Sequence, residues 1–215
     1  MKVCYTVNFG NYDELKAPTV ITPGWTYICI TDSMGPVPAP YIAARVSADM
    51  FCGDMKLASR KMKITDVLHG YTVSVYHDAN IQVKCNLNEL VERYHKTDLT
   101  VMKHPTRKTW QEEAEACVAF GLVQQEKIDL LQKYIDLIPS SEPITPLAAC
   151  GVIIRSNSTR VIVFQAAWFL LVDRFSTRDQ ITFNFAANQS GINFGYMPYS
   201  VIEDNQFKWH PHAAK

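Results

Sequence analysis

Asp78 and Asn80 are the residues of this 215-residue chain whose types and spacing most suggest chemistry. They follow the apolar run Val73–His77, and the chain turns apolar again at Ile81 and Val83. Two residues apart in an extended segment, their side chains are predicted to project from the same face. Oxygen-bearing side chains placed in this way can hold a hard divalent cation together with the phosphates of a substrate. Asp and Asn are also common turn residues, so a simple turn is the alternative.

Three basic residues could accompany such a site. Arg60 and Lys63 lie one helical turn apart, where they could neutralise phosphates or simply form a solvated helix face. His104 follows an apolar run and could meet a substrate or a metal, although a lone histidine is also common in turns.

Acidic residues near two predicted helix starts give further candidates. Glu113 or Glu115 could bind sugar hydroxyls, whereas Thr109–Glu112 is explained as a capping pair. Thr177–Gln180 likewise fits a capping box, which accounts for Gln180 but not for Asp179.

The elements that must position these residues alternate between strands and helices. β-Branched and aromatic runs predict strands over 2–8, 26–30, 72–76, 99–103 and 152–155. Apolar spacing and caps predict helices over 49–65, after Asn86, after Thr109, over 128–138 up to Pro139, and over 161–172. This alternation predicts an α/β fold with a mostly parallel sheet flanked by helices, in which ligands bind beyond the carboxyl ends of the strands.

Composition excludes several classes of function. Twenty-one basic residues balance twenty-one acidic ones, which argues against a charge-driven nucleic-acid coat or membrane adsorber. The longest apolar stretch, 161–172, is shorter than the roughly 20 residues of a membrane span, so we expect no stable membrane insertion. The six cysteines include no closely spaced pair, and the N-terminus lacks the apolar run of a signal peptide. We therefore expect free thiols and a cytoplasmic location.

The chain is expected to form one domain over 1–215, with an irregular tail from about residue 190. Near its end, His210 and His212 could ligate a metal only if the tail folds back. Trp168 lies in an apolar helical segment and is expected in the core.

Several short motifs occur in an order that resembles a known family. They are Tyr5–Lys16, Tyr27–Asp32, Ser59–Lys63, Tyr76–Ile81, Lys103–Pro105, Glu112–Glu115, Val152–Arg155, Trp168 and Arg178–Gln180. In this order they resemble a family of small glycosyltransferase-like domains, found in bacteria and in plant proteins of mucilage synthesis and pollen-tube turgor control. The resemblance implies a GT-A-like fold, with a Rossmann-like sheet that binds a nucleotide sugar, over Tyr5 to about Phe185.

The resemblance also implies roles for individual residues. The turn formed by Thr6, Asn8, Phe9 and Gly10 would border the nucleotide base, and Asp32 would hold the base or ribose. Arg60 and Lys63 would meet the diphosphate, and Asp78 and Asn80 would hold Mn²⁺ or Mg²⁺. Asp179 and Glu113 would be the catalytic carboxylates. The remaining residues implied in nucleotide-sugar binding are Ala79, His104 and Arg178. Where many such enzymes have a second Asp, this chain has Asn80, a weaker cation ligand.

These expectations together predict a glycosyltransferase, hexosyl- or pentosyl-transferring, that uses a nucleoside-diphosphate sugar, with UDP favoured. Its acceptor would be a hydroxyl of a glycan, lipid or protein in glycan assembly, with hydroxymethylated bases of phage DNA as the second choice. The alternative is a non-catalytic module of the same fold that binds a nucleotide or glycan.

Overall fold

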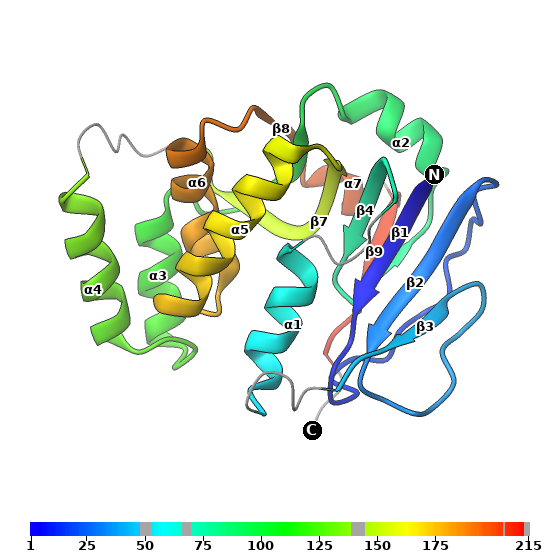
Figure 1. Cartoon of the computed structure of the whole chain (residues 1–215), viewed down its shortest axis with the longest axis horizontal. Coiled ribbons are helices and arrows are strands. Elements are labelled where there is room, and N and C mark those ends of the chain that lie inside the picture. The colour runs from blue at the N-terminus through cyan, green and yellow to red at the C-terminus, as the bar shows by residue number, and fades with distance from the viewer. Residues whose placement is uncertain (48–52, 66–69, 139–144, 204, 213–215) are drawn as a thin grey trace.

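The architecture is a mixed sheet between layers of helices (Figure 1). The computed structural model describes residues 1–47, 53–65, 70–138, 145–203 and 205–212. Within these residues one sheet has the strand order β3-β2-β1-β4-β7-β6-β8. In that order the strands are Ile42–Arg45, Trp25–Thr31, Lys2–Val7, Val73–His77, Ala148–Ser156, Leu99–Lys103 and Phe194–Met197.

Only β7 runs against its neighbours in this sheet as described. It pairs antiparallel with β4 and β6, whereas the remaining neighbouring pairs are parallel. The carboxyl ends of β1, β2, β4 and β6 therefore lie along one edge, which the beginning of β7 shares. The predicted α/β fold with a mostly parallel sheet is confirmed.

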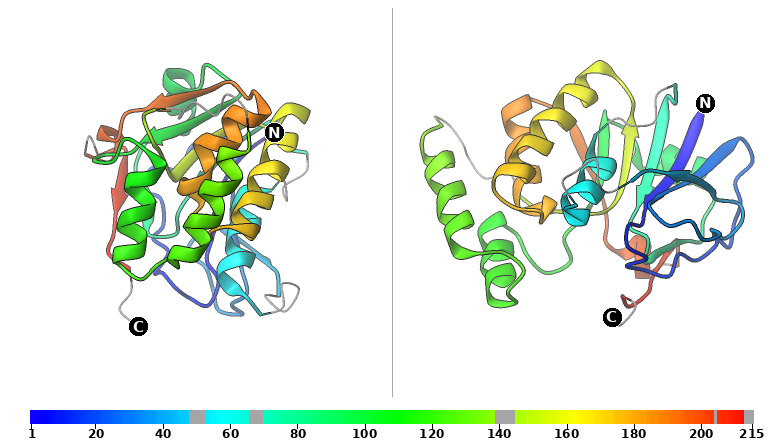
Figure 2. Two further views of the ribbon diagram at one scale, coloured as in Figure 1. Left: turned by 90° about the vertical axis from the view of Figure 1, so that its left-hand side faces the viewer. Right: turned by 60° about the horizontal axis from the view of Figure 1, so that its bottom comes forward.

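The helices cover the sheet on both faces. In chain order the described helices are α1 Met55–Ile64, α2 Leu87–Tyr94, α3 Trp110–Ala119, α4 Gln125–Asp136, α5 Thr159–Arg174, α6 Asp179–Ser190 and α7 Ser200–Glu203. One face packs against α1, α5 and α6, and the other against α2 and the small sheet of β5 (Ile81–Val83) and β9 (Phe207–Trp209). Figures 1 and 2 place α3 and α4 beyond α6, at the end away from β2 and β3.

Local sequence signals account for most of these elements. Asn86 and Thr109 cap α2 and α3 as predicted, because their side chains accept the amide N–H groups of Asn88 and Glu112. Trp168 is fully buried, as predicted. The predicted start of α1 and Pro139 lie outside the described residues. The described cysteines are free thiols, as predicted. Across the part of the chain that is described, no helix has the length and apolar character needed to span a membrane.

The tail is regular where an irregular segment was expected. From residue 194 the chain forms β8, α7 and β9. These segments have partners that local sequence does not reveal, because β8 pairs with β6 and β9 with β5, and Phe207 is fully buried. The tail therefore completes the core.

Candidate functional site

The strand-end residues singled out in the sequence lie at the same edge of the sheet. Asn8, Asp32, Asp78 and His104 each follow a strand of the same direction, namely β1, β2, β4 and β6. The arrowheads of β1, β2 and β4 point the same way in Figure 1. In sheets of this kind ligands bind at that edge.

A buried lysine joins two carboxylates here. Lys63 Nζ lies 2.6 Å from Asp179 Oδ2 and 3.3 Å from Asp78 Oδ1. The side chains of Lys63 and Asp179 are 2% and 7% exposed, whereas that of Asp78 is 35% exposed. We call Arg60, Lys63, Tyr76, Asp78 and Asp179 the Lys63 cluster. Asp78 is its solvent-accessible carboxylate.

Elements far apart in sequence fix this cluster. The Lys63 carbonyl, in the last turn of α1, accepts hydrogen bonds from Arg155 of β7 and Tyr5 of β1. The indole N–H of Trp168 donates to the Asp179 carbonyl at 3.1 Å, which ties the start of α6 to α5. The ammonium and the carboxylate therefore sit on regular elements whose backbones are held in place.

Arg60 adds a second positive charge to Asp179. Its NH1 lies 3.7 Å from Asp179 Oδ2, and its Nε donates to the Thr177 carbonyl at 2.9 Å. Burial alone would raise the pKa of Asp179, but Arg60 and Lys63 outweigh it and lower this pKa to about 2. The Asp179 carboxylate is therefore ionised at neutral pH and is a weak proton acceptor.

Asp78 lies in a tight turn, where the sequence predicted an extended segment. The Ile81 N–H donates to the Asp78 carbonyl at 2.8 Å, which closes the turn between β4 and β5. The Asp78 N–H donates to the Gly151 carbonyl of β7, and Asp78 Oδ1 accepts the Tyr76 hydroxyl at 2.6 Å. Asp78 and Asn80 therefore do not share a face by strand alternation, because alternation holds only for extended backbone.

Asn80 is buried and held by the tail. Its side-chain amide donates to the His210 carbonyl at 3.1 Å, while the His210 N–H donates to the Asn80 carbonyl at 2.8 Å. The neighbouring Ala79 is buried as well.

These contacts do not fit a divalent cation shared by Asp78 and Asn80. Asp78 Oδ1 is already engaged by a hydroxyl and an ammonium group, and the Asn80 amide is fixed by the tail. A hard cation requires several oxygens that converge on one point. The Mn²⁺ or Mg²⁺ expected from the sequence stays a prediction.

Glu113 forms a second buried cluster next to the first. It is fully buried, and it contacts the guanidinium of Arg107, His104 Nε2 at 3.7 Å, and Arg178 NH2 at 3.8 Å. Gln180 donates its side-chain amide to the same carboxylate. We call these five residues the Glu113 cluster. Arg178 and Asp179 are consecutive, so the two clusters adjoin.

The predicted capping box over Thr177–Gln180 is wrong. The N-cap of α6 is Arg178, which makes no side-chain capping hydrogen bond, and Gln180 is used by Glu113 instead. The tertiary contact with α3 overrides the local pattern. Glu115, the other acidic candidate on that helix, is exposed.

His104 is oriented by the loop that follows it. Its Nδ1 accepts the Arg107 N–H at 2.9 Å, which leaves a proton on Nε2, toward Glu113. Burial lowers the pKa of His104, with Arg107 acting in the same direction against the attraction of Glu113. The ring is therefore neutral at pH 7.

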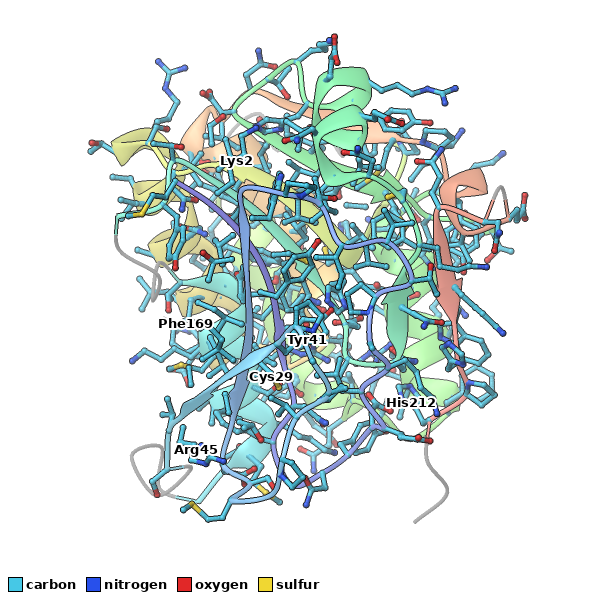
Figure 3. All side chains as sticks on the ribbon, turned by 90° about the vertical axis from the view of Figure 1, so that its right-hand side faces the viewer. Lys2, Cys29, Tyr41, Arg45, Phe169 and His212 are labelled. Carbon is cyan, nitrogen blue, oxygen red and sulfur yellow. The ribbon has the colours of Figure 1, made fainter. Side chains whose placement is uncertain are left out.

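A cavity lies at the ends of β1 and β2. The cavity has a volume of about 180 Å³, and its lining includes Asn8, Asp13, Thr31 and Ser33 with the proline-rich segment 35–38. Figure 3 looks onto this side and shows Cys29, another lining residue, close to Tyr41. Among the lining residues, Asn8 is one that the resemblance implies at the nucleotide base.

The residues predicted at the nucleotide base differ in burial and in the hydrogen bonds that they already make. Asp32 accepts the Gly10 N–H at 2.8 Å and so braces the turn after β1. Thr6 and Phe9 are buried, so their side chains belong to the core rather than to a ligand surface. Asn8 exchanges hydrogen bonds with the Asp13 backbone.

The tail folds back, but its histidines do not converge. His210 Nε2 lies 3.2 Å from Gln82 Oε1, and His212 Nδ1 lies 2.8 Å from Asp13 Oδ1. Figure 3 shows His212 at this N-terminal loop. The two rings therefore brace the small sheet and the loop after β1.

Residues 59–208, more than two thirds of the chain, match the TOD1/MUCI70 glycosyltransferase-like domain. The chain belongs to this family. The match includes the Lys63 and Glu113 clusters but not β1 and β2, whose resemblance was read from the sequence motifs alone.

The fold also resembles a solved glycosyltransferase. The apo structure of WbbM, a bifunctional glycosyltransferase, aligns with 90% of this chain at a TM-score of 0.51 and 12% sequence identity. At this level of identity the likeness shows the fold alone, and this chain spans 38% of the WbbM chain. A comparison with curated proteins finds no match.

Sequence reasoning missed several residues of this glycosyltransferase-like domain. Arg107 and Gln180 contact the buried Glu113, Tyr76 donates to Asp78, and Gly151 backs the Asp78 turn. Tyr76 precedes Asp78 by two residues and could have been noticed from that spacing. Arg107 lies six residues before Glu113, in the loop that leads into α3. Gln180 and Gly151 depend on contacts between elements distant in sequence, for which the sequence offers no local signal.

Proposed function

We propose that this glycosyltransferase-like domain transfers a sugar from a nucleoside-diphosphate sugar, with UDP favoured, to a hydroxyl acceptor. The observation that carries the proposal is one ion-pair network at the carboxyl edge of the sheet, in which accessible Asp78 pairs with Lys63, Lys63 with Asp179, and Asp179 with Arg60. Family membership supports the reaction class, and the cavity at β1 and β2 supports a place for the base.

Arg60 is the proposed partner of the leaving diphosphate. The nucleoside diphosphate gains negative charge as the sugar bond breaks, so a preorganised cation stabilises the transition state. Arg60 keeps 24% of its side chain exposed while its Nε is anchored to the Thr177 carbonyl. Lys63, by contrast, is buried, so its charge acts on the diphosphate through the cluster rather than by contact.

Asp179 and Glu113 are proposed to position the site rather than to exchange protons. Each is buried and paired with basic groups, and the Asp179 pKa of about 2 disfavours general base catalysis. Asp78 is the carboxylate that a sugar or acceptor hydroxyl can reach.

The acceptor is proposed to be a hydroxyl of a cellular glycan or its precursor on lipid or protein. Hydroxymethylated DNA ranks second, because a chain of zero net charge is poorly suited to a large duplex footprint. The exposed Lys96, Lys103 and Lys108 could contact DNA, whereas Arg107 is paired with Glu113. A reducing compartment such as the cytoplasm is proposed from the free thiols.

The alternative is a binding module of the same fold without turnover. The buried, ion-paired state of both predicted catalytic carboxylates favours it. The two functions differ in one measurement, because only an enzyme releases the nucleotide from the sugar.

The test is to incubate the protein with a panel of labelled nucleotide sugars, each with glycan precursors and with hydroxymethylated DNA. Both MnCl₂ and EDTA buffers are used. We expect transfer or slow donor hydrolysis with at least one UDP-sugar. Asp78→Asn should reduce it at least tenfold, while the surface variant Asp98→Asn retains it. Donor binding without any release of nucleotide would favour the module, and label on DNA alone would reverse the acceptor ranking.

A further inference from the structure

We propose that the diphosphate of the donor binds at this edge without a divalent cation, because Lys63 fills the place between Asp78 and Asp179. The inference rests on the proposed function and concerns the same site. It assigns the neutralisation of the phosphates to basic side chains of the protein instead of a metal ion.

The first support is the position of the Lys63 ammonium. It lies 2.6 Å from one carboxylate oxygen and 3.3 Å from the other, and its side chain is 2% exposed. The Tyr76 ring lies below it, with Nζ 4.9 Å from the ring centre. A divalent cation between the same carboxylates would have to displace a buried, paired ammonium group or share the space with it.

The second support is the state of the Asn80 amide. Its nitrogen donates to the His210 carbonyl, and the backbone of the same two residues is hydrogen-bonded as well. Turning this side chain toward Asp78 would break the contact between the turn and the tail. Asp78 therefore lacks the partner that a two-ligand cation site needs.

The third support is the balance of charge. The two adjoining clusters contain four basic side chains and three carboxylates, namely Arg60, Lys63, Arg107 and Arg178 against Asp78, Glu113 and Asp179. A divalent cation favours an excess of negative oxygens, whereas a diphosphate favours an excess of positive charge. Arg60, Arg107 and Arg178 each keep part of their side chains exposed. The arrangement therefore suits the anion.

The deciding experiment measures UDP binding by isothermal titration calorimetry in about 5 mM EDTA and in about 5 mM MnCl₂. A Mn²⁺ concentration of this order exceeds the Kd of even a weak metal site, so such a site would be filled. We expect the two Kd values to agree within about threefold, whereas a cation that bridges protein and diphosphate makes a difference of about 100-fold. Binding that is tenfold or more tighter with Mn²⁺ overturns the inference but leaves the proposed function standing. If UDP, ADP, GDP and CDP all fail to bind in either buffer, the proposed function itself is wrong.

A variant assigns the effect to Lys63. Lys63→Ala leaves Asp78 and Asp179 facing each other without their cation, so UDP should bind at least tenfold more weakly in EDTA. Mn²⁺ should then restore much of the loss, because the vacated space lies between two carboxylates. Lys56→Ala, an exposed residue of the same helix, is the matched control and should bind UDP as the wild type does.

Two results would count against Lys63. One is a Lys63→Ala variant that binds UDP like Lys56→Ala in EDTA, and the other is a loss that Mn²⁺ does not relieve. Should Lys63→Ala fail to fold, Lys63→Gln removes the charge while keeping a polar side chain that is only one atom shorter, and it is read in the same way. The wild-type comparison of the two buffers decides the main point in either case.

Discussion

At the scale of single residues, Asp179 supplies the buried negative charge that pairs with Lys63 and Arg60 in the Lys63 cluster. Its carboxylate forms ion pairs with Lys63 and Arg60. It also lies at the first position of α6, where the helix dipole favours an anion. Removing one partner of a buried ion pair is costly because it leaves the other charge uncompensated.

Asp179→Asn should therefore destabilise the protein by about 3 kcal/mol, the lower end of the values measured when one partner of a buried ion pair is removed. Urea unfolding followed by circular dichroism gives the free energy of unfolding. Asp98→Asn is the matched control, because Asp98 pairs with Arg160 at the surface, 3.6 Å away. That change should cost less than about 1 kcal/mol. Equal losses in the two variants would show that the Lys63 pair contributes no more than a surface contact.

At the scale of elements, the reversed strand β7 shapes the turn that carries Asp78. Its Gly151 carbonyl accepts the Asp78 N–H, and a Cβ at Gly151 would lie 3.4 Å from Asp78 Oδ2 and 3.0 Å from Ile81 Cδ1. The absence of a side chain at this position lets the turn lie directly against β7.

Gly151→Ala is expected to push Asp78 and Ile81 by a few tenths of an ångström. Crowding of this kind costs about 1 kcal/mol of stability, and it should weaken UDP binding severalfold because Asp78 moves. Thermal melting and calorimetry measure the two effects. Gly195→Ala in β8, where the new Cβ meets Thr97 Oγ1 at 3.4 Å, is the control and should leave UDP binding unchanged. Unchanged binding in both variants would remove Asp78 from the donor site.

The elements also show how far the sequence could predict this fold and site. The runs 2–8, 26–30, 72–76 and 99–103 carry enough β-branched and aromatic residues to predict β1, β2, β4 and β6 closely. The shared direction of these strands follows from the alternation with helices and brings Asp78 and His104 to one edge. The reversal of β7 and the pairing of β8 and β9 could not be predicted, because they depend on partners distant in sequence.

Two local patterns were misread for the same reason. The segment Asp78–Asn80 is compatible with both a strand and a turn, and the hydrogen bonds to β7 and the tail select the turn. Thr177–Gln180 matches a capping box, but Glu113 on α3 takes the Gln180 side chain. The resemblance implied that Arg60, Lys63, Asp78 and Asp179 serve one site, whereas only the structure shows that these four side chains form ion pairs with one another.

At the scale of the whole molecule, the proposed base site and the charged clusters lie in different parts of the fold. The cavity at β1 and β2 lies on the N-terminal side, and the Lys63 and Glu113 clusters lie where α1, α3 and α6 meet β4 and β6. The family match begins at residue 59 and so includes the second part only. The paired charges of these clusters also tie the stability of the fold to pH.

Stability should fall in two steps as the pH decreases. Burial lowers the pKa of His77, His95 and His104 below the ordinary value of 6.5, so the unfolded chain binds more protons than the folded protein just below that pH. All three shifts have the same sign, and their destabilising effects add as the pH drops through about 6.5. The second step belongs to Asp179, whose contribution is complete above its ordinary pKa of 3.8 and is lost as the pH falls toward 2.

The first step can be assigned to particular rings. His77 is fully buried, its Nδ1 lies 3.0 Å from the Asp78 carbonyl, and its Nε2 lies 2.8 Å from the Tyr41 hydroxyl. A neutral ring satisfies both contacts, with Nδ1 donating to the carbonyl and Nε2 accepting the hydroxyl, and a second proton would break this arrangement. Melting temperature measured from pH 7.5 to 5.5 should fall by several degrees, since each kcal/mol lost lowers Tm by roughly 2–4 °C in a domain of this size. His77→Gln removes one titrating group and should flatten the slope over this range, whatever its effect on Tm at pH 7.5. A wild-type Tm that stays constant between pH 7.5 and 5.5 would show that these histidines are protonated as readily in the folded protein as in the unfolded chain.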